Sequence, residues 1–329
     1  MRISVIGDGG WGTALAILLA GNGHAVTVWG PFEDTIDSIR HNGENTTYLP
    51  KVKIPDAIRW TTDREETAVE AELVVLAVPS KFFSETAQAF STLIPAASPV
   101  VSVAKGLDSE TRLRMSALAD RALNRDDVAV LSGPSHAEEV ARGIPTAVVA
   151  AARQLDQAET VQGVFSSSRF RVYTSTDMAG VELGGALKNV MAVAVGVSDG
   201  LGFGDNTRAA LITRGLAEMT RIGCALGAER ATFAGLAGMG DLIVTATSRH
   251  SRNRRFGEAL GQGRTADDIL AATKQVAEGY WNCTIVRAIA KDNAIEAPIT
   301  EEICAIVHKN KPPVEAVRTL LDREPKPED

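Results

Sequence analysis

Short apolar runs rich in β-branched residues alternate with amphipathic stretches through the first half of the chain. Seven runs predict strands, at residues 3–6, 25–29, 73–78, 100–104, 128–131, 146–150 and 170–174. Helical periodicity lies between them and is clearest at residues 12–21, 82–93, 111–123 and 155–165. This alternation is typical of a parallel sheet covered on both faces, and it predicts a doubly wound α/β domain.

Strand signals end after Thr176 and Asp177, which have the residue types of a helix cap. Gly, Ala and Leu then recur at helical spacing as far as Leu321, which predicts an all-helical second half. Because no linker separates the halves, we place the boundary inside a long helix over residues 177–198. Three segments are expected: a dinucleotide-binding domain at 1–180, a helical substrate and catalytic domain at 181–322, and a disordered charged tail at 323–329.

Composition narrows the classes of partner. The 329 residues carry a net charge of −7, which argues against nucleic acid or an anionic membrane held by bulk electrostatics. The apolar run at residues 190–197 has eight residues and is too short to span a bilayer, so no stable membrane insertion is expected. The three cysteines are odd in number and form no C-x-x-C pair, which predicts reduced thiols and a cytoplasmic location.

A glycine-rich turn follows the first predicted strand, with the sequence GDGGWG at residues 7–12. In a Rossmann-type domain Gly7 permits the tight turn, Gly9 lets the backbone approach a pyrophosphate, and Gly12 packs helix on strand. The opening helix adds partial positive charge at its N-terminus. Such a run can also be an ordinary glycine turn, but its position between strand and helix predicts dinucleotide binding.

The second strand gives no signal for the choice between NAD and NADP. An acidic residue at its end would bind the ribose hydroxyls of NAD, but residues 28–32 contain none and Glu33 comes slightly late. A basic group for the 2′-phosphate of NADP is also missing. The cofactor preference therefore stays open.

Two later strands end in turns with residues suited to ligand binding. Lys105 follows one strand, and Gly133 and Ser135 follow the next. The carboxyl edge of an open α/β sheet is where ligands bind, so an ammonium there would meet an anionic or carbonyl substrate. Glycine and proline after a strand are also common as plain turn residues.

Lys188 lies in the most apolar helix of the chain. Between residues 183 and 197, Lys188 and Asn189 are the only polar side chains, so part of Lys188 should be desolvated. One alternative is a lysine with no catalytic role, whose ammonium group extends to the surface. The alternative that we favour is a general acid/base whose pKa is lowered by burial, and by Lys105 if the two converge.

An arginine-rich segment follows Asp241, with Arg249, Arg252, Arg254 and Arg255 within seven residues and Ser251 as an expected helix N-cap. On a negatively charged chain this clustering indicates a phosphate site, although a solvated helix face is the alternative. Asp241 is expected to cap a helix, to pair with an arginine, or to orient the lysine or a substrate hydroxyl. No metal-ligand spacing appears, so a metal-free mechanism is expected.

These residues together resemble bacterial-type NAD(P)-dependent glycerol-3-phosphate dehydrogenase over almost the whole chain. The blocks that carry the resemblance are GDGGWGTALA, AKGL, LSGPSHAEEVARGIPT, ELGGALKNV, SDGLGFGDNTRAALITRGLAEM, GMGDLIVTATSRHSRNRRFG, VAEGY and APITEEI. It implies a helical domain like that of 6-phosphogluconate dehydrogenase. It also implies that the protein interconverts dihydroxyacetone phosphate and glycerol 3-phosphate by hydride transfer with NAD(P)H. This reaction would supply glycerol 3-phosphate for glycerophospholipid synthesis.

The resemblance also implies roles for single residues. Lys188 would be the proton acceptor, and Pro31 departs from the polar or basic residue usual beside the adenosine ribose. Dinucleotide contacts are implied for Gly10, Trp11, Pro31, Lys105, Ala137, Arg252, Val276 and Glu278. Contacts with the phosphorylated triose are implied for Lys105, Gly133, Ser135, Lys188, Asp241, Ser251, Arg252 and Asn253. Such proteins commonly form homodimers, although no interface is visible in the sequence.

Two other functions fit parts of the pattern. A related dehydrogenase of another hydroxy or keto acid would keep the two-domain plan but would not need clustered arginines. A dinucleotide-binding redox sensor would not need a desolvated Lys188.

Overall fold

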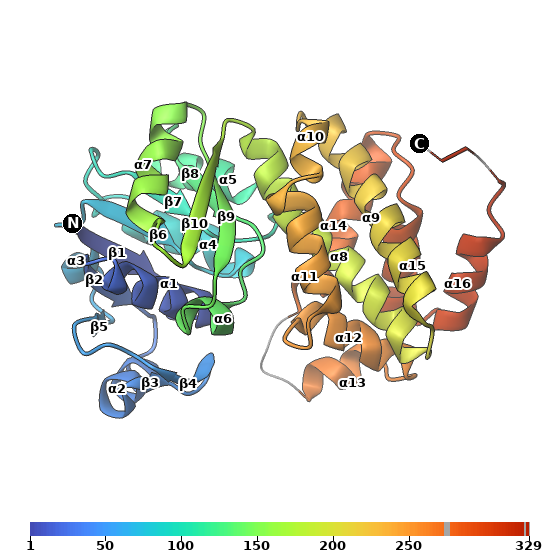
Figure 1. Ribbon diagram of the computed structural model, residues 1–329, viewed down its shortest axis with the longest axis horizontal. Coiled ribbons are helices and arrows are strands. Elements are labelled where there is room, and N and C mark those ends of the chain that lie inside the picture. The colour runs from blue at the N-terminus through green and yellow to red at the C-terminus, as the bar shows by residue number, and fades with distance from the viewer. Residues whose placement is uncertain (273–276, 326, 329) are drawn as a thin grey trace. The chain divides into compact units, whose positions relative to one another are not determined.

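The computed structural model describes residues 1–272, 277–325, 327 and 328. The chain forms two compact units (Figure 1). The first contains Met1–Asp108 and Leu113–Val181, and the second contains Ser109–Arg112 and Glu182–Asp329. The two units are described separately below.

An eight-stranded sheet forms the centre of the first unit, with strands in the order β10-β9-β8-β7-β6-β1-β2-β5. Ile3 of β1 lies opposite Val26 of β2 and Leu73 of β6, and both neighbours run parallel to β1. The winding direction reverses between β1 and β6, the kind of switch point at which open α/β sheets bind ligands. The strands are β1 Arg2–Ile6, β2 Ala25–Trp29, β5 Arg59–Thr61, β6 Leu73–Leu76, β7 Val100–Ser102, β8 Ala129–Ser132, β9 Thr146–Ala151 and β10 Phe170–Ser175.

The sheet is predominantly parallel, as expected for a doubly wound domain, but one pair of strands is antiparallel. β9 runs antiparallel to β8, with Leu131 opposite Ala150, and β10 runs parallel to β9. A parallel neighbour needs a crossover that returns to the same end of the sheet. The connection between β8 and β9 contains only the short helix α6 (Ala137–Ala141), which packs on α1 (Gly10–Gly21).

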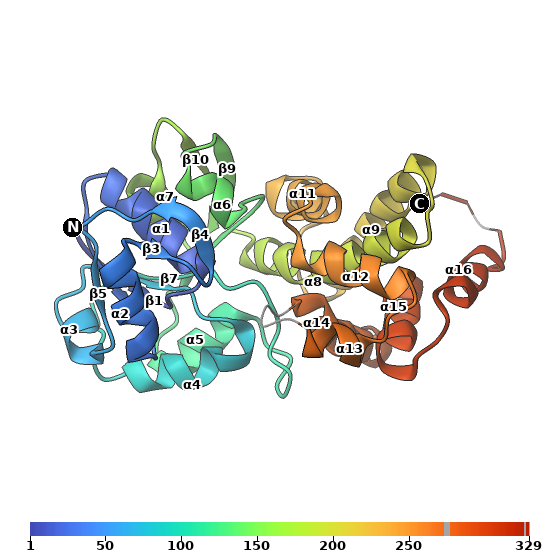
Figure 2. The ribbon, with the colours of Figure 1, turned by 90° about the horizontal axis from the view of Figure 1, so that it is seen from below.

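Helices cover both faces of this sheet. Side chains alternate along the strands, so that Val75 belongs to one apolar core and its neighbours Val74 and Leu76 to the other. The first core includes α1 and α7, and the second includes α4 and α5, as Figure 2 shows. The remaining elements are α2 Glu33–Asn42, α3 Arg64–Ala68, α4 Ser80–Phe90, α5 Met115–Leu123, α7 Leu155–Phe165, and the two-stranded sheet of β3 Glu44–Asn45 and β4 Leu49–Lys53.

One helix begins later than its periodicity predicts. The pattern over residues 111–123 suggests a helix from 111, but α5 starts at Met115. Arg112 has a φ of 60°, in the left-handed region that a right-handed helix cannot include, and Arg114 forms a bridge with Leu107. The apolar periodicity therefore extends through a loop before the helix begins.

The second unit contains only helices among its described residues, as predicted. α8 begins where the cap was expected, because the carboxylate of Asp177 accepts a hydrogen bond from the Gly180 backbone N–H at 2.8 Å. The helices are α8 Met178–Gly200, α9 Asp205–Ala225, α10 Arg230–Phe233, the π-helix η1 Leu236–Gly240, α11 Asp241–Thr247, α12 Arg252–Gly261, α13 Ala266–Ala271, α14 Glu278–Asp292, α15 Pro298–Lys309 and α16 Pro313–Leu321.

α8 is the core helix of the second unit. Its 23 residues extend well beyond the eight-residue apolar run, and the helix is long and apolar enough to cross a membrane by length and composition alone. Its most apolar 18-residue window is, however, entirely buried inside the protein. Gly196 and Gly200 let α12 approach closely, since a Cβ on either would lie about 2 Å from a backbone oxygen of that helix.

Candidate active site

Each glycine in the turn between β1 and α1 meets a different steric demand. Gly7 has a φ of 123°, and a Cβ there would lie 2.5 Å from the Ala77 carbonyl oxygen. A Cβ on Gly12 would lie 2.0 Å from the Gly7 carbonyl oxygen, but no described atom lies within 4 Å of a Cβ built on Gly9. The fold itself therefore needs Gly7 and Gly12, whereas Gly9 leaves open space beside the backbone.

The N-terminus of α1 suits an anionic group. Its N-cap, Gly9, supplies no side-chain cap, and the first turn has no acidic side chain. A Cβ on Gly10 would lie 3.9 Å from the Cβ of Ala137, so two of the expected dinucleotide contacts lie together. The buried Nε1 of Trp11 has no hydrogen-bond partner among the described residues. This cradle fits a dinucleotide, whose pyrophosphate would meet the positive end of the helix.

Asp8 is a buried carboxyl group in the same turn, and no sequence pattern singles it out. A Cβ on Gly30, the first residue after β2, would lie 2.5 Å from Asp8 Oδ2. That oxygen has no hydrogen-bond partner in the described part of the chain. Burial raises the pKa of Asp8, and a hydrogen bond from its own backbone opposes the shift. The fold thus brings an acidic group to the end of β2, next to the exposed Pro31.

Lys105 joins the ends of two neighbouring strands. Its Nζ donates hydrogen bonds to the Gly133 carbonyl at 2.8 Å and to the Ser135 hydroxyl at 3.3 Å. The Ser135 hydroxyl in turn donates to the Gly133 carbonyl at 2.9 Å. Three residues expected to bind substrate therefore lie in one cluster beyond the carboxyl ends of β7 and β8.

Lys188 is buried in the middle of α8 and is 5% exposed. Its Nζ forms a close ion pair with Asp241 and donates a hydrogen bond to the Thr245 hydroxyl at 2.9 Å. The Thr245 hydroxyl donates to the Asp241 backbone carbonyl at 2.6 Å, one turn away on α11. A buried carboxylate favours the ammonium form of its partner, whereas desolvation disfavours it. The expected contact of Asp241 with the lysine is therefore present.

Asn253 connects three helices. Its side-chain N–H donates to the Asn189 side-chain oxygen at 2.9 Å, and its oxygen accepts a hydrogen bond from the Gly279 backbone N–H at 2.9 Å. Ser251 is the N-cap of α12, as predicted, and accepts a hydrogen bond from the Arg254 backbone N–H at 3.2 Å. The N-terminus of α12 is therefore held by contacts with two other helices, and Arg252 is exposed at its first position.

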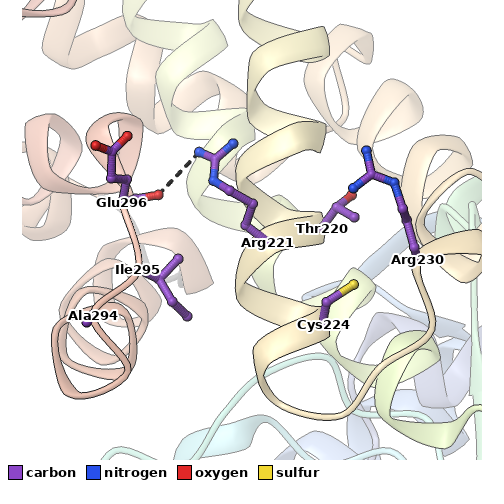
Figure 3. A pocket seen from close by; sticks show the side chains of 7 residues that line it. All are labelled: Thr220, Arg221, Cys224, Arg230, Ala294, Ile295 and Glu296. Atoms are coloured by element: carbon purple, nitrogen blue, oxygen red, sulfur yellow. Dashed lines mark hydrogen bonds between the residues drawn. The ribbon is translucent and has the colours of Figure 1, made fainter. Parts of the chain in front are cut away.

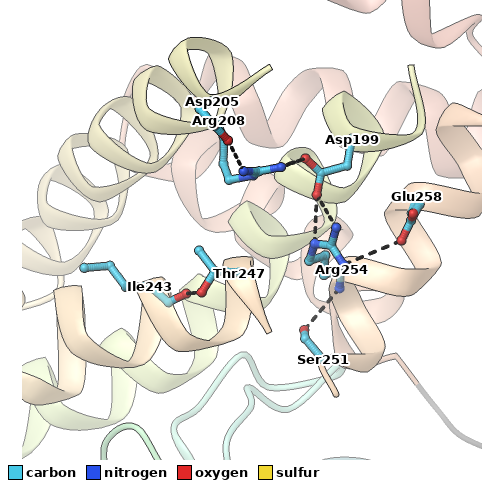
Figure 4. A network of polar contacts seen from close by, with 8 residues as sticks. All are labelled: Asp199, Asp205, Arg208, Ile243, Thr247, Ser251, Arg254 and Glu258. Atoms are coloured by element: carbon cyan, nitrogen blue, oxygen red, sulfur yellow. Dashed lines mark hydrogen bonds and ion pairs between the residues drawn. The ribbon is translucent and has the colours of Figure 1, made fainter. Parts of the chain in front are cut away.

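The prediction that all four arginines serve an anion is wrong for Arg254. Figure 4 shows Asp199 between Arg208 and Arg254, and its carboxylate pairs with Arg254 at 2.7 Å and with Arg208 at 2.9 Å. Arg254 also lies 3.6 Å from Glu258, so its charge is neutralised within the helical unit. The clustering of charges in the sequence could not show which arginine has a buried counter-charge.

The remaining expected cofactor contacts are Val276 and Glu278. Glu278 is the first residue of α14 and is half-buried. Val276 lies outside the described residues. Thr245 is a partner of Lys188 that was not anticipated, and its only sequence signal is its spacing of four residues from Asp241 in a mostly apolar helix.

Known proteins resemble this chain over nearly its full length. Two family models match, described as NAD-dependent glycerol-3-phosphate dehydrogenase N-terminus over residues 2–158 and C-terminus over residues 177–318. Glycerol-3-phosphate dehydrogenase [NAD(P)+] of Moorella thermoacetica is 50% identical over 322 residues, covering 98% of this chain and 96% of the relative. The protein of the same name from Agathobacter rectalis is 47% identical over 325 residues, covering 99% and 97%.

Solved structures agree with these sequence matches. The crystal structure of glycerol-3-phosphate dehydrogenase from Coxiella burnetii has a TM-score of 0.94 and 40% identity, covering 98% of this chain and 99% of that one. A ketopantoate reductase from Ralstonia eutropha has a TM-score of 0.62 at 15% identity, covering 96% and 100%, and shares the fold alone.

Proposed function

The chain belongs to the NAD-dependent glycerol-3-phosphate dehydrogenase family, and we propose how its residues interconvert dihydroxyacetone phosphate and sn-glycerol 3-phosphate. The buried ion pair of Lys188 with Asp241 is the observation that carries the proposal. An ammonium kept from bulk water is costly unless a partner or a function compensates. In this family it has both, since the reaction requires a proton donor for a developing alkoxide.

Lys188 is the general acid of the reduction. When bound, NAD(P)H supplies the hydride for the ketone carbon. Lys188 then donates a proton from Nζ to the developing alkoxide oxygen, and Asp241 and Thr245 hold Nζ in place. In the oxidation the neutral amine takes the proton back from the hydroxyl. General acid/base catalysis typically contributes about 10²–10⁴-fold to the rate.

The phosphate of the substrate is held at the N-terminus of α12. Arg252 offers a planar guanidinium with no ion pair to any described residue, and the helix end adds partial positive charge. Ser251 and Asn253 fix this end of the helix, and Asn253 keeps one amide hydrogen for the substrate. Anchoring the phosphate fixes the orientation of the carbonyl group.

The first unit holds the dinucleotide. The pyrophosphate would rest on the open face of Gly9 and the N-terminus of α1, beside Trp11 and Ala137. Lys105, held by Gly133 and Ser135, would present its ammonium at the carboxyl edge of the sheet. We assign Glu278 and Val276 to the cofactor on the family resemblance alone.

The cellular setting remains a proposal as well. We propose a cytoplasmic location, because the three cysteines are odd in number and form no C-x-x-C pair. We propose that the product supplies glycerophospholipid synthesis and that the protein forms a homodimer. Light scattering coupled to size exclusion would test the dimer.

An assay of reduced-cofactor oxidation tests the reaction. We expect turnover with dihydroxyacetone phosphate, and a kcat/KM at least about 10²-fold lower with dihydroxyacetone, because two charge-assisted hydrogen bonds are lost. Pyruvate serves as the carboxylate control. Comparable rates with dihydroxyacetone or pyruvate would contradict the phosphate assignment.

A further inference from the structure

A hollow of about 480 Å³ lies in the second unit, away from the residues assigned above. Its walls come from α9, α10 and the turn between α14 and α15, and it shares no residue with the Lys188 cluster or the N-terminus of α12. Figure 3 shows Arg221 and Arg230 pointing the same way from two different helices, with Thr220 between them. We call this feature the arginine hollow.

The two guanidiniums lack direct counter-charges. Arg221 donates a hydrogen bond to the Glu296 backbone carbonyl at 3.2 Å, as Figure 3 shows. Neither Arg221 nor Arg230 has a carboxylate within 4.0 Å among the described residues. Glu296 is the one described carboxylate that lines the hollow, and it pairs with Arg323 at 2.9 Å. On a chain of net charge −7, the hollow is therefore a local concentration of positive charge.

The buried carboxylate behind this wall is already satisfied. Glu218 is fully buried on α9 and accepts hydrogen bonds from the backbone N–H groups of Ile299 and Thr300, both at 2.9 Å, and from the Thr300 hydroxyl at 2.6 Å. Burial raises the pKa of Glu218, and these bonds and the charge of Arg221 only partly oppose the shift. Glu218 thus stabilises the start of α15 and does not form an ion pair with Arg221.

The rest of the lining has a different chemistry. Ala294 and Ile295 form an apolar wall, and the exposed Cys224 lies one helical turn from Thr220 on α9. Pockets of this volume hold small organic ligands, and guanidiniums from separate elements suit the several oxygens of a phosphate group. We propose that the arginine hollow binds a small phosphorylated organic anion, with its phosphate on Arg221 and Arg230 and its carbon body against Ile295.

Cys224 provides a local reporter of binding. It is exposed, whereas Cys283 and Cys304 are buried, so iodoacetamide should label Cys224 first in the native protein. We expect glycerol 2-phosphate to slow this labelling by a factor of 1 + [L]/Kd, about fivefold at four times its Kd. Glycerol with sodium chloride at equal ionic strength should give no protection. Inorganic phosphate should protect more weakly, because it has no carbon body for the apolar wall.

Matched variants locate the effect. In Arg230→Gln, about tenfold more glycerol 2-phosphate should be needed for the same protection, because one charge-assisted hydrogen bond is lost. The protein should stay folded, because Arg230 is exposed. Arg64 is an exposed arginine of the first unit, and in Arg64→Gln glycerol 2-phosphate should protect Cys224 as it does in the wild type. Arg252→Gln should also protect normally, which separates this hollow from the proposed substrate phosphate site. Equal protection by sodium chloride, unchanged protection in Arg230→Gln, or its loss in Arg252→Gln would overturn the proposal.

Discussion

The candidate site residues of the two units differ in kind, backbone in the first and buried side chains in the second. In the first unit the cradle is backbone: a turn of glycines whose missing side chains leave room, and a helix end whose N–H groups are uncovered. In the second unit the chemistry that we propose depends on buried side chains, Lys188 with Asp241 and Thr245, held by contacts between separate helices. A backbone cradle is disturbed by adding atoms, whereas a buried polar cluster is disturbed by removing them.

The largest expected effect is on turnover when Lys188 is removed. Lys188→Met should lower kcat by about 10²–10⁴-fold, because the proton donor is gone. It should leave the fluorescence-measured Kd of NADH unchanged, since the cradle lies in the first unit. A kcat in this variant equal to that of the wild type would remove Lys188 from the mechanism.

The same substitution removes Lys188 as the ion-pair partner of the buried Asp241 carboxylate, and breaking a buried pair by removing one partner typically costs about 3–5 kcal/mol of stability. The double variant Lys188→Met with Asp241→Asn removes both charges and serves as the control. We expect thermal unfolding of the double variant to return toward the wild type while kcat stays low. Recovery of activity together with stability would mean that the lysine acts only through the fold.

Two neighbouring arginines sharpen the comparison within the second unit. Arg252→Gln should raise KM for dihydroxyacetone phosphate by roughly 10- to 100-fold, equivalent to about 1.5–3 kcal/mol, with little loss of stability. Arg254→Gln should lower stability and leave this KM nearly unchanged. Its guanidinium pairs with Asp199, so the variant leaves that carboxylate paired with Arg208 alone. Steady-state kinetics and thermal unfolding of both variants decide the assignment, and similar KM values would defeat it.

Two glycines test the backbone character of the first unit. Gly9→Ala should weaken NADH binding by about tenfold without changing stability, because its Cβ would enter the space reserved for the pyrophosphate. Gly12→Ala should destabilise the protein by about 1–3 kcal/mol, since its Cβ would meet the Gly7 carbonyl. Fluorescence titration and chemical denaturation separate the two effects. Equal losses of stability would show that Gly9 is structural too.

Much of this architecture could be predicted from local patterns. The glycine turn, α7 and the Ser251 cap depend on neighbours in the sequence, so their signals are contiguous. The antiparallel entry into β9 could not be predicted in this way, because it depends on where the short α6 packs. The neutralisation of Arg254 was equally hidden, since its partner Asp199 lies 55 residues away on α8.

Asp8 gives the smallest expected effect and tests how far the first unit is a backbone site. Its carboxylate lies against Gly30 at the end of β2, where a 2′-phosphate of NADP would approach the ribose subsite. Asp8→Asn should therefore tighten NADPH binding by roughly fivefold, about 1 kcal/mol of relieved repulsion, and leave NADH binding nearly unchanged.

The pH dependence of the wild type supplies an independent check. Burial raises the pKa of Asp8, so the group becomes neutral at a higher pH than an exposed aspartate as the solution is acidified. The preference for NADH over NADPH should shrink as the pH falls through this pKa, and Asp8→Asn should show no such change. Since no charged side chain contributes to the shift, ionisation of Asp8 alone should account for the difference between the two titrations. A parallel response of the variant and the wild type would place the selectivity elsewhere, in the backbone around Pro31.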